Sequence, residues 1–254
     1  MKYDVISADS HLDLIWLPPD LFTANSSAAL KDRMPYVTDG PRGKEWVTKN
    51  GSSFGLMNGM GSGGRQYIPG QIHRSDRMAA EGIYEDGKKG IRRMTDPELR
   101  LRDQDRDGVQ AEVLYGILGA TIRLKDNEAA GEMLRIYNEW LADFCATHPD
   151  RYAGLACIPN HDADAAIGEI ERVATRGVAR GLEISRRHDM APLWDPGGTR
   201  CGTRSQRPVY RCTSTRSAAA TGPTPRSSPP KCNWPRAPQA LPTSRCTWQT
   251  CCYR

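Results

Sequence analysis

An aspartate and a histidine two residues apart follow the first short β-rich run of the chain. The run covers residues 3–8 (YDVISA), and Asp9, Ser10 and His11 come directly after it. Residues i and i+2 of a strand point to the same face, so the Asp9 carboxylate and the His11 imidazole can converge on one cation. Both groups are ordinary zinc ligands. The spacing therefore indicates half of a metal site, although an isolated pair of this kind would more often cap a turn.

Two further residues could contribute to the same site. Asp13 follows the pair closely and is either a polar neighbour of the site or a solvated loop acid. His161 comes just after an apolar run at 152–158, and loops that follow strands often carry functional residues. His161 is therefore a candidate substrate-binding residue, with a helix cap or a surface position as the alternative. The same alternative is favoured for His148.

A glycine-rich stretch at 51–64 (GSSFGLMNGMGSGG) precedes a small group of basic residues. Arg65, His73 and Arg74 could meet a substrate carboxylate. The stretch lacks the Gly-Lys-Ser/Thr ending and the preceding strand of a phosphate-binding loop. A loop that covers a substrate, or a plain linker, fits the pattern better.

The elements that position these residues alternate between strands and helices. A Pro and an acid after Asp96 mark a helix start, and residues 127–148 carry apolar side chains at spacings of three and four. Short apolar runs predict buried strands. Strands are predicted at 3–8, 111–115, 152–158 and 181–184, and helices at 97–108, 127–148 and 162–176.

Alternation with such short links favours parallel β/α units, as in a barrel or a doubly wound sheet. Residues 23–95 show little periodicity and are predicted to be a long irregular insertion. Cys145 and Cys157 fall on an apolar helix face and inside a strand, so we expect small core residues in a reducing compartment.

Several separated blocks resemble the amidohydrolase-related metal-dependent hydrolases, most closely the branch that includes aminocarboxymuconate-semialdehyde decarboxylase. The blocks occur in the family's order over roughly residues 3–197; they are ADSHLDLIWLPPDLF, LRDQDRDGVQAEVLYG, YNEWLADFCATHPDRYAGLACIPNHDADAAIGEIERV and PLWDP.

The resemblance implies an incomplete TIM (β/α)8 barrel with a divalent metal, usually zinc, at the carboxyl ends of the strands. It implies hydrolysis or non-oxidative decarboxylation of a small carboxylated or aromatic substrate, and a homo-oligomer for an intact relative. Asp9 and His11 would be metal ligands. The family's remaining ligands, a His on the fifth strand and an Asp on the eighth, are absent from residues 1–199, so no catalytic residue is assigned.

The last fifth of the chain has a different composition. All 30 acidic residues precede residue 200, whereas six of the eight cysteines follow it, and Val209 and Leu241 are the only branched aliphatic residues there. Such a segment cannot bury enough apolar surface to offset its ordering entropy. The sequence therefore predicts a barrel part at 1–198 and a disordered tail at 199–254.

A shifted reading frame explains this tail. Relatives continue past PLWDP into a Trp-Asp-Pro-Leu-Trp block, and one T restored before the codon of Gly198 permits that peptide in place of residues 198–203. Every tail cysteine would then become Leu, Met or Val. In the restored frame Pro208–Ala219 is compatible with Ala-Gly-Val-Pro-Val-His-Leu-His-Thr-Ile-Gly-Gly. Thr213 and Thr215 stand where the two histidines of the fifth strand would be.

Composition separates the remaining classes of function. No segment resembles a signal peptide or a run of about 18 apolar residues, so we expect a soluble, cytoplasmic chain without a membrane partner. We expect a small-molecule substrate and no nucleic-acid partner, because the basic tail lacks aromatic residues on a recognisable module. With half of its ligands missing, the chain is predicted to bind metal weakly and to be inactive. A metal-free β/α binding module, or nucleic-acid binding through the tail, is the alternative.

Overall fold

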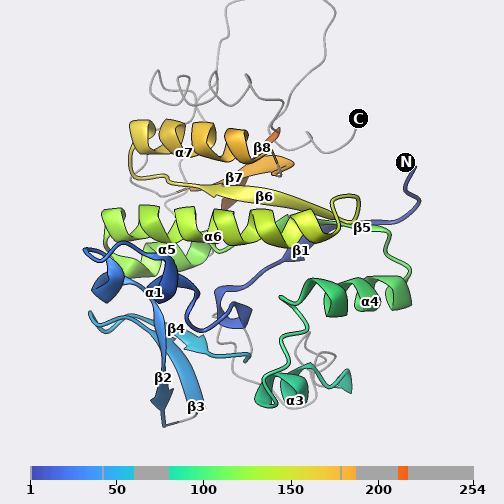
Figure 1. Ribbon diagram of the computed structural model, residues 1–254, viewed down its shortest axis with the longest axis horizontal. Helices are drawn as coiled ribbons and strands as arrows, with labels where there is room; N and C mark the ends of the chain where they lie inside the picture. Colours follow the sequence, from blue (N-terminus) through green and yellow to red (C-terminus); the bar gives the residue numbers. More distant parts are fainter. Residues whose placement is uncertain (1, 42, 60–79, 178, 187–210, 217–254) are drawn as a thin grey trace, which may run out of the picture.

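A curled sheet of parallel strands forms the centre of the molecule (Figure 1). The computed structural model describes residues 2–41, 43–59, 80–177, 179–186 and 211–216. The strand order is β1-β5-β6-β7-β8, and every neighbouring pair is parallel. The strands are β1 (Ile6–His11), β5 (Ala111–Tyr115), β6 (Tyr152–Ile158), β7 (Gly181–Arg186) and β8 (Arg211–Arg216).

Helices connect these strands in the described part of the chain. They are α4 (Pro97–Asp107), α5 (Leu118–Leu124), α6 (Asn127–Thr147) and α7 (Ala163–Arg176). The alternating pattern predicts three of these four, α5 being the exception. Aspartate caps fix the starts of α4, α6 and α7: the side chains of Asp96, Asp126 and Asp162 accept backbone N–H groups of the first turn. Gly108 ends α4 in the left-handed conformation at φ 70°.

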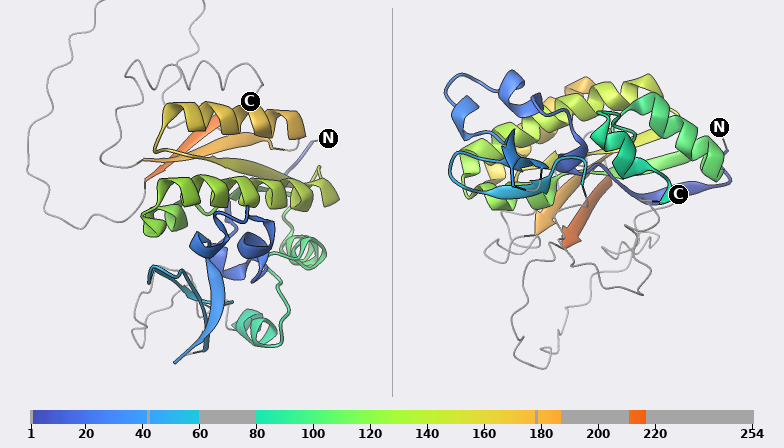
Figure 2. Two further views of the ribbon diagram at one scale, coloured as in Figure 1. Left: turned by 60° about the vertical axis from the view of Figure 1, so that its left-hand side comes forward. Right: turned by 90° about the horizontal axis from the view of Figure 1, so that it is seen from below.

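Alternation along β7 assigns the two faces of the sheet. Leu182 and Ile184 belong to the same apolar cluster as Ile170 and Val173 of α7. Successive strand residues point to opposite faces, so Glu183 lies on the inner, concave face. The helices α6 and α7 run side by side along the outer face (Figure 2). The parallel strands therefore form half of a barrel, with helices outside.

The predicted irregular insertion is ordered over most of its described part, which corrects that expectation. An antiparallel sheet of order β2-β3-β4 lies at the end of the molecule away from α7 and β8 (Figure 1). Its strands are short, and few of their side chains are buried, among them Trp46 and Phe54, so hydrophobic alternation gave no signal. Before the predicted insertion come η1 (Leu14–Trp16) and the start of α1 (Leu21–Asn25), and within it lie η2 (Lys31–Arg33), β2 (Tyr36–Gly40), β3 (Gly43–Val47), β4 (Ser53–Leu56) and α3 (Ile83–Lys88).

The fifth parallel strand lies within the segment predicted to be disordered. β8 pairs with β7 in register, and Glu183 stands opposite Thr213. The prediction of a disordered tail from 199 onwards is therefore wrong for Arg211–Arg216, because backbone pairing with β7 gives these residues a place in the sheet despite their polar composition. The other residues of the tail lie outside the described part of the chain.

No helix in the described part of the chain is both long enough and apolar enough to span a membrane.

Candidate functional site

The carboxyl end of β1 carries the predicted aspartate and histidine side by side. Asp9 Oδ1 and His11 Nε2 are 3.1 Å apart. The Asp9 side chain is 89% exposed and that of His11 40%. The His11 ring lies against Tyr115 of β5, with ring centroids 5.5 Å apart. The structure therefore brings the predicted pair together on the inner face, at the open mouth of the half barrel.

The pair has the separation that a shared divalent cation requires. Metal bonds of roughly 2.1 Å at angles of about 90–110° place two neighbouring ligand atoms roughly 3.0–3.4 Å apart, and the observed 3.1 Å lies in this range. An ion pair or a hydrogen bond has the same geometry. Within the residues that the structure describes, no group of three or more His, Cys, Asp or Glu side chains could hold a metal. Asp9 and His11 thus fit half of a metal site.

A small pocket, partly open to solvent, lies next to the residues that follow β1, and Asp9 and His11 are not among its described lining residues. Phe54 of β4 and Ile117 give it apolar walls, and Asp13 and Arg123 are its charged lining residues among those described. Arg123 Nη1 also donates a hydrogen bond to the carbonyl oxygen of Ser53, at 3.2 Å. Apolar walls with a few polar groups are typical of a small-molecule site.

The inner face also holds a buried carboxylate. Glu183 is 2% exposed and accepts the Gly116 N–H at 2.8 Å. The Cys157 thiol lies 3.9 Å from the same oxygen. Burial raises the pKa of this thiol well above its usual range, and the Glu183 charge adds to the rise. Burial likewise raises the pKa of the Tyr137 hydroxyl. Cys157 therefore stays a thiol at neutral pH and is not an activated nucleophile.

Among the other predicted site residues, neither His161 nor His148 has a described contact with the Asp9–His11 pair. His161 follows β6, and its Cε1 lies near Gly131 of α6, 3.8 Å from where a Cβ would be; it is not among the described residues that line the pocket, so its substrate role stays a prediction. His148, which directly follows α6, pairs with Glu98 at 2.7 Å. This contact fits the helix-end or surface position given above as the alternative to a role in the site. Arg65, His73 and Arg74 lie outside the described residues.

Sequence patterns alone missed several residues that build this region. Arg123 and Phe54 come from elements, α5 and β4, that the pattern did not predict. Glu112 and Glu183 were visible as single acids inside apolar strands, in AEVLY and GLEIS. A charged side chain in such a position is almost never buried unless it is paired, and this signal could have marked both.

A parallel half barrel with an aspartate and a histidine at the carboxyl end of its first strand is the arrangement that the resemblance noted from the sequence implies. The chain belongs to the amidohydrolase family, whose sequence model matches residues 10–216. The match ends at the last residue of β8.

The curated relatives that the chain matches include decarboxylases of one kind. A gamma-resorcylate decarboxylase of Rhodococcus jostii is 33% identical over 78 residues, which cover 31% of this chain and 24% of the relative. Another, of a Polaromonas species, is 28% identical over 108 residues, 38% of this chain and 33% of the relative. The matched segments thus span a quarter to a third of these proteins.

Solved structures confirm the fold. An amidohydrolase from Mycobacterium avium subsp. paratuberculosis superposes with a TM-score of 0.61 at 17% identity, over 84% of this chain and 58% of that one. A 5-carboxyvanillate decarboxylase from Novosphingobium aromaticivorans, with bound manganese, gives 0.52 at 16% identity, over 85% and 53%. The chain therefore covers little more than half of these neighbours, as an incomplete barrel does.

Proposed function

We propose that this chain carries half of a divalent-metal site for the hydrolysis or decarboxylation of a small aromatic carboxylate. The observation that carries the proposal is the 3.1 Å separation of Asp9 Oδ1 and His11 Nε2 at the carboxyl end of β1. The names of the relatives, gamma-resorcylate decarboxylase and a manganese-containing 5-carboxyvanillate decarboxylase, support the substrate class and favour decarboxylation.

In this proposal, separate residues would bind the metal, the aromatic ring and the carboxylate of the substrate. Asp9 and His11 would hold the ion, which supplies polarisation of a substrate oxygen or a bound water of lowered pKa. The apolar pocket walls, Phe54 among them, would hold an aromatic ring and exclude water. Arg123 supplies positive charge at the pocket for a carboxylate. Zinc and manganese both fit an oxygen and a nitrogen ligand, so zinc remains a prediction.

The remaining ligands, in this proposal, were lost through a shifted reading frame after Gly197. The register of β8 supports it, because Thr213 and Thr215 occupy a strand beside β7, where the restored frame would encode histidines. With two ligands in place of four, the chain would bind metal weakly and would convert substrate at a negligible rate. The edges of a half barrel would also favour aggregation.

Metal titration tests the proposal. The electron paramagnetic resonance signal of free Mn²⁺ measures Mn²⁺ binding. Zn²⁺ binding is measured by the Mn²⁺ that Zn²⁺ displaces. We expect weak binding that His11→Ala abolishes and that Thr213→His with Thr215→His strengthens by roughly tenfold or more. Equal affinity in the wild type and His11→Ala would refute the site. Sequencing the gene across codons 196–200 tests the frame directly, and an unambiguous in-frame reading would refute that part.

The pocket also favours a second candidate, a metal-free binding module. It predicts that an aromatic carboxylate such as salicylate binds equally well with a chelator present and in His11→Ala. Dependence of salicylate binding on metal would exclude this candidate.

A further inference from the structure

Behind the Asp9–His11 pair, a buried carboxylate on the neighbouring strand accepts several hydrogen bonds. Glu112 of β5 has a side chain 12% exposed. Its oxygens accept from Arg100 Nε at 2.6 Å, Gln104 Nε2 at 2.7 Å and Ser10 Oγ at 3.1 Å. The Ser10 oxygen is in turn 2.8 Å from Ser7 Oγ. We name these five residues the Glu112 cluster.

The cluster spans an irregularity in β1. Ser7 is opposite Glu112, but Ser10 is opposite Leu114, so β1 uses three steps where β5 uses two. The extra residue is a β-bulge at positions 8–9, and bulges beside active sites re-aim side chains. Asp9 lies within this irregularity, and Ser7 and Ser10 on either side of it are joined through the Glu112 cluster.

Arg100 extends the same contacts to the histidine. Its Nη1 donates to the carbonyl of Met94 at 2.8 Å and approaches the carbonyl of His11 at 3.5 Å. The Arg100 side chain is 8% exposed, so water cannot readily replace its hydrogen bonds to these carbonyls and to Glu112. One buried ion pair thus contacts β1 at Ser10, which lies between Asp9 and His11, and at the backbone carbonyl of His11 itself.

We propose that Arg100 and Glu112 are positioning residues that hold the β1 bulge and thereby set the distance between the Asp9 carboxylate and the His11 imidazole. The inference rests on the proposed metal site for its functional meaning. Neither residue faces the inner side of the sheet, so neither touches metal or substrate. Partners of this kind typically change metal affinity by 10–100-fold when they are removed.

The test compares two arginines of similar burial. Arg100→Met and Glu112→Gln remove parts of the cluster, and Arg93→Met is the matched control. Arg93 is 15% exposed and pairs with Asp103 at 2.7 Å, without a described bond to β1. Mn²⁺ affinity and amide hydrogen exchange, by mass spectrometry of peptides over β1 and β6, are measured on the full chain.

We expect Arg100→Met and Glu112→Gln to weaken Mn²⁺ binding about tenfold or more and to speed exchange in β1 relative to β6. Arg100→Lys should lose less Mn²⁺ affinity and less protection in β1 than Arg100→Met. Arg93→Met should leave Mn²⁺ affinity unchanged and should not speed exchange in β1 relative to β6. Unchanged relative exchange in β1, or wild-type Mn²⁺ affinity in both cluster variants, would overturn the proposal.

The two proposals fail differently. If the wild-type chain binds no Mn²⁺, the proposed metal site is refuted, while exchange in β1 still decides whether Arg100 and Glu112 hold the bulge. Faster exchange in both variants would support that role, and unchanged exchange would refute it.

Discussion

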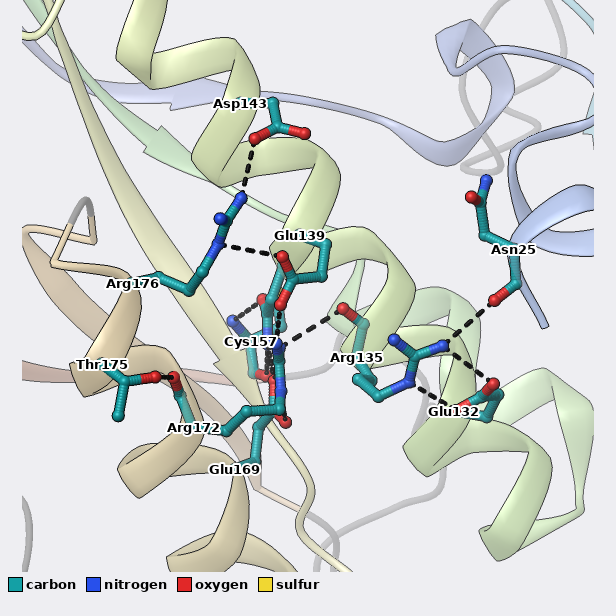
Figure 3. A network of polar contacts seen from close by, with 11 residues as sticks. Asn25, Glu132, Arg135, Glu139, Asp143, Cys157, Glu169, Arg172, Thr175 and Arg176 are labelled. Carbon is teal, nitrogen blue, oxygen red and sulfur yellow. Dashed lines mark hydrogen bonds and ion pairs between the residues drawn. The ribbon is translucent and has the colours of Figure 1, made fainter. Parts of the chain in front are cut away.

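Two buried polar clusters with similar chemistry lie in different parts of the molecule. The Glu112 cluster joins α4, β5 and β1. The other, which we name the Asn138 cluster, joins α6, β6 and α7 through Asn138, Cys157, Glu169, Arg172 and Glu139 (Figure 3). Each surrounds one buried glutamate with an arginine and an amide side chain.

The Asn138 cluster closes the edge of a strand. Asn138 Nδ2 donates to the carbonyl of Cys157 at 2.9 Å, and its Oδ1 accepts the Cys157 N–H at 2.8 Å. Glu169 Oε1 accepts from Asn138 at 2.5 Å and from Arg172 at 2.6 Å. Arg172 pairs also with Glu139, which lies nearer to solvent.

The difference lies in where each cluster ends. The Glu112 cluster ends on the strand that carries Asp9 and His11, whereas the Asn138 cluster continues outward to half-exposed Arg172 and Arg176 between the helices (Figure 3). Similar chemistry therefore has different consequences: loss of the Glu112 cluster should alter the site, and loss of the Asn138 cluster should alter only stability.

The largest effect on stability is expected at Asn138. Asn138→Ala leaves the N–H and carbonyl of Cys157 and one Glu169 oxygen without this partner, so we expect a loss of about 3 kcal/mol in the free energy of unfolding. Urea denaturation measures it. Mn²⁺ affinity should not change.

Asn160→Ala is the matched control for this substitution. Asn160 is half-buried, and among the described residues its amide donates to the carbonyl and hydroxyl of Ser185, so a loss of about 1 kcal/mol is expected. A change of Mn²⁺ affinity in Asn138→Ala at temperatures where the variant is folded would contradict the contrast between the two clusters.

Gly116 is where the Asn138 cluster meets the mouth of the half barrel. A Cβ there would lie 2.4 Å from Cys157 Sγ and 2.7 Å from Tyr137 Cε1. Both neighbours are fully buried and cannot move away easily, so Gly116→Ala should cost about 2 kcal/mol through overpacking. Thermal denaturation should show a fall in Tm of roughly 6 °C.

A second glycine of the same region is a control that distinguishes a steric clash from the general effect of replacing glycine by alanine. Gly119 in α5 has no heavy atom within 4 Å of its added Cβ, so Gly119→Ala should be neutral or stabilising by up to about 1 kcal/mol. Equal losses of stability at both positions would refute the crowding argument.

The sequence predicted the parallel strands that consist of continuous apolar runs. Residues 111–115 and 152–158 are the bounds of β5 and β6, because continuous apolar runs with turn residues beside them have few alternatives. The pair Asp9 and His11 followed from strand periodicity, although the bulge before it shifts that periodicity.

The parts that could not be predicted depend on tertiary contacts. β2, β3 and β4 bury few side chains, so their order comes from pairing with one another. β8 is polar and is ordered by the edge of β7. The Glu112 cluster joins positions up to 105 residues apart, from Ser7 to Glu112, and no local pattern indicates which donors a buried glutamate will meet.

The smallest of these effects is expected at a partly exposed ion pair at the start of α6. Asp126, at the start of α6, accepts from Arg33 Nε at 2.7 Å and from its Nη2 at 2.6 Å, and also caps the helix. The hydrogen bond from Arg33 is the main cause that lowers the pKa of Asp126 below its usual 3.8. Asp126→Asn keeps an oxygen for the cap but loses the charge. We expect it to cost about 1 kcal/mol at pH 6, because solvent screens the pair.

The cost should depend on pH with a defined sign. A carboxyl whose folded pKa is lowered contributes stability that is fully present above its unfolded pKa and is lost as pH falls through the folded value. The difference between the wild type and Asp126→Asn should therefore be constant from pH 6 to about 5 and shrink below pH 3.8, as measured by urea midpoints. Asp162→Asn, which removes the charge from the cap of α7, should cost only a few tenths of a kcal/mol at pH 6, because no described ion pair involves Asp162. A pH-independent difference at Asp126 would show that its bond to Arg33, unlike the bonds within the two buried clusters, contributes nothing to folding.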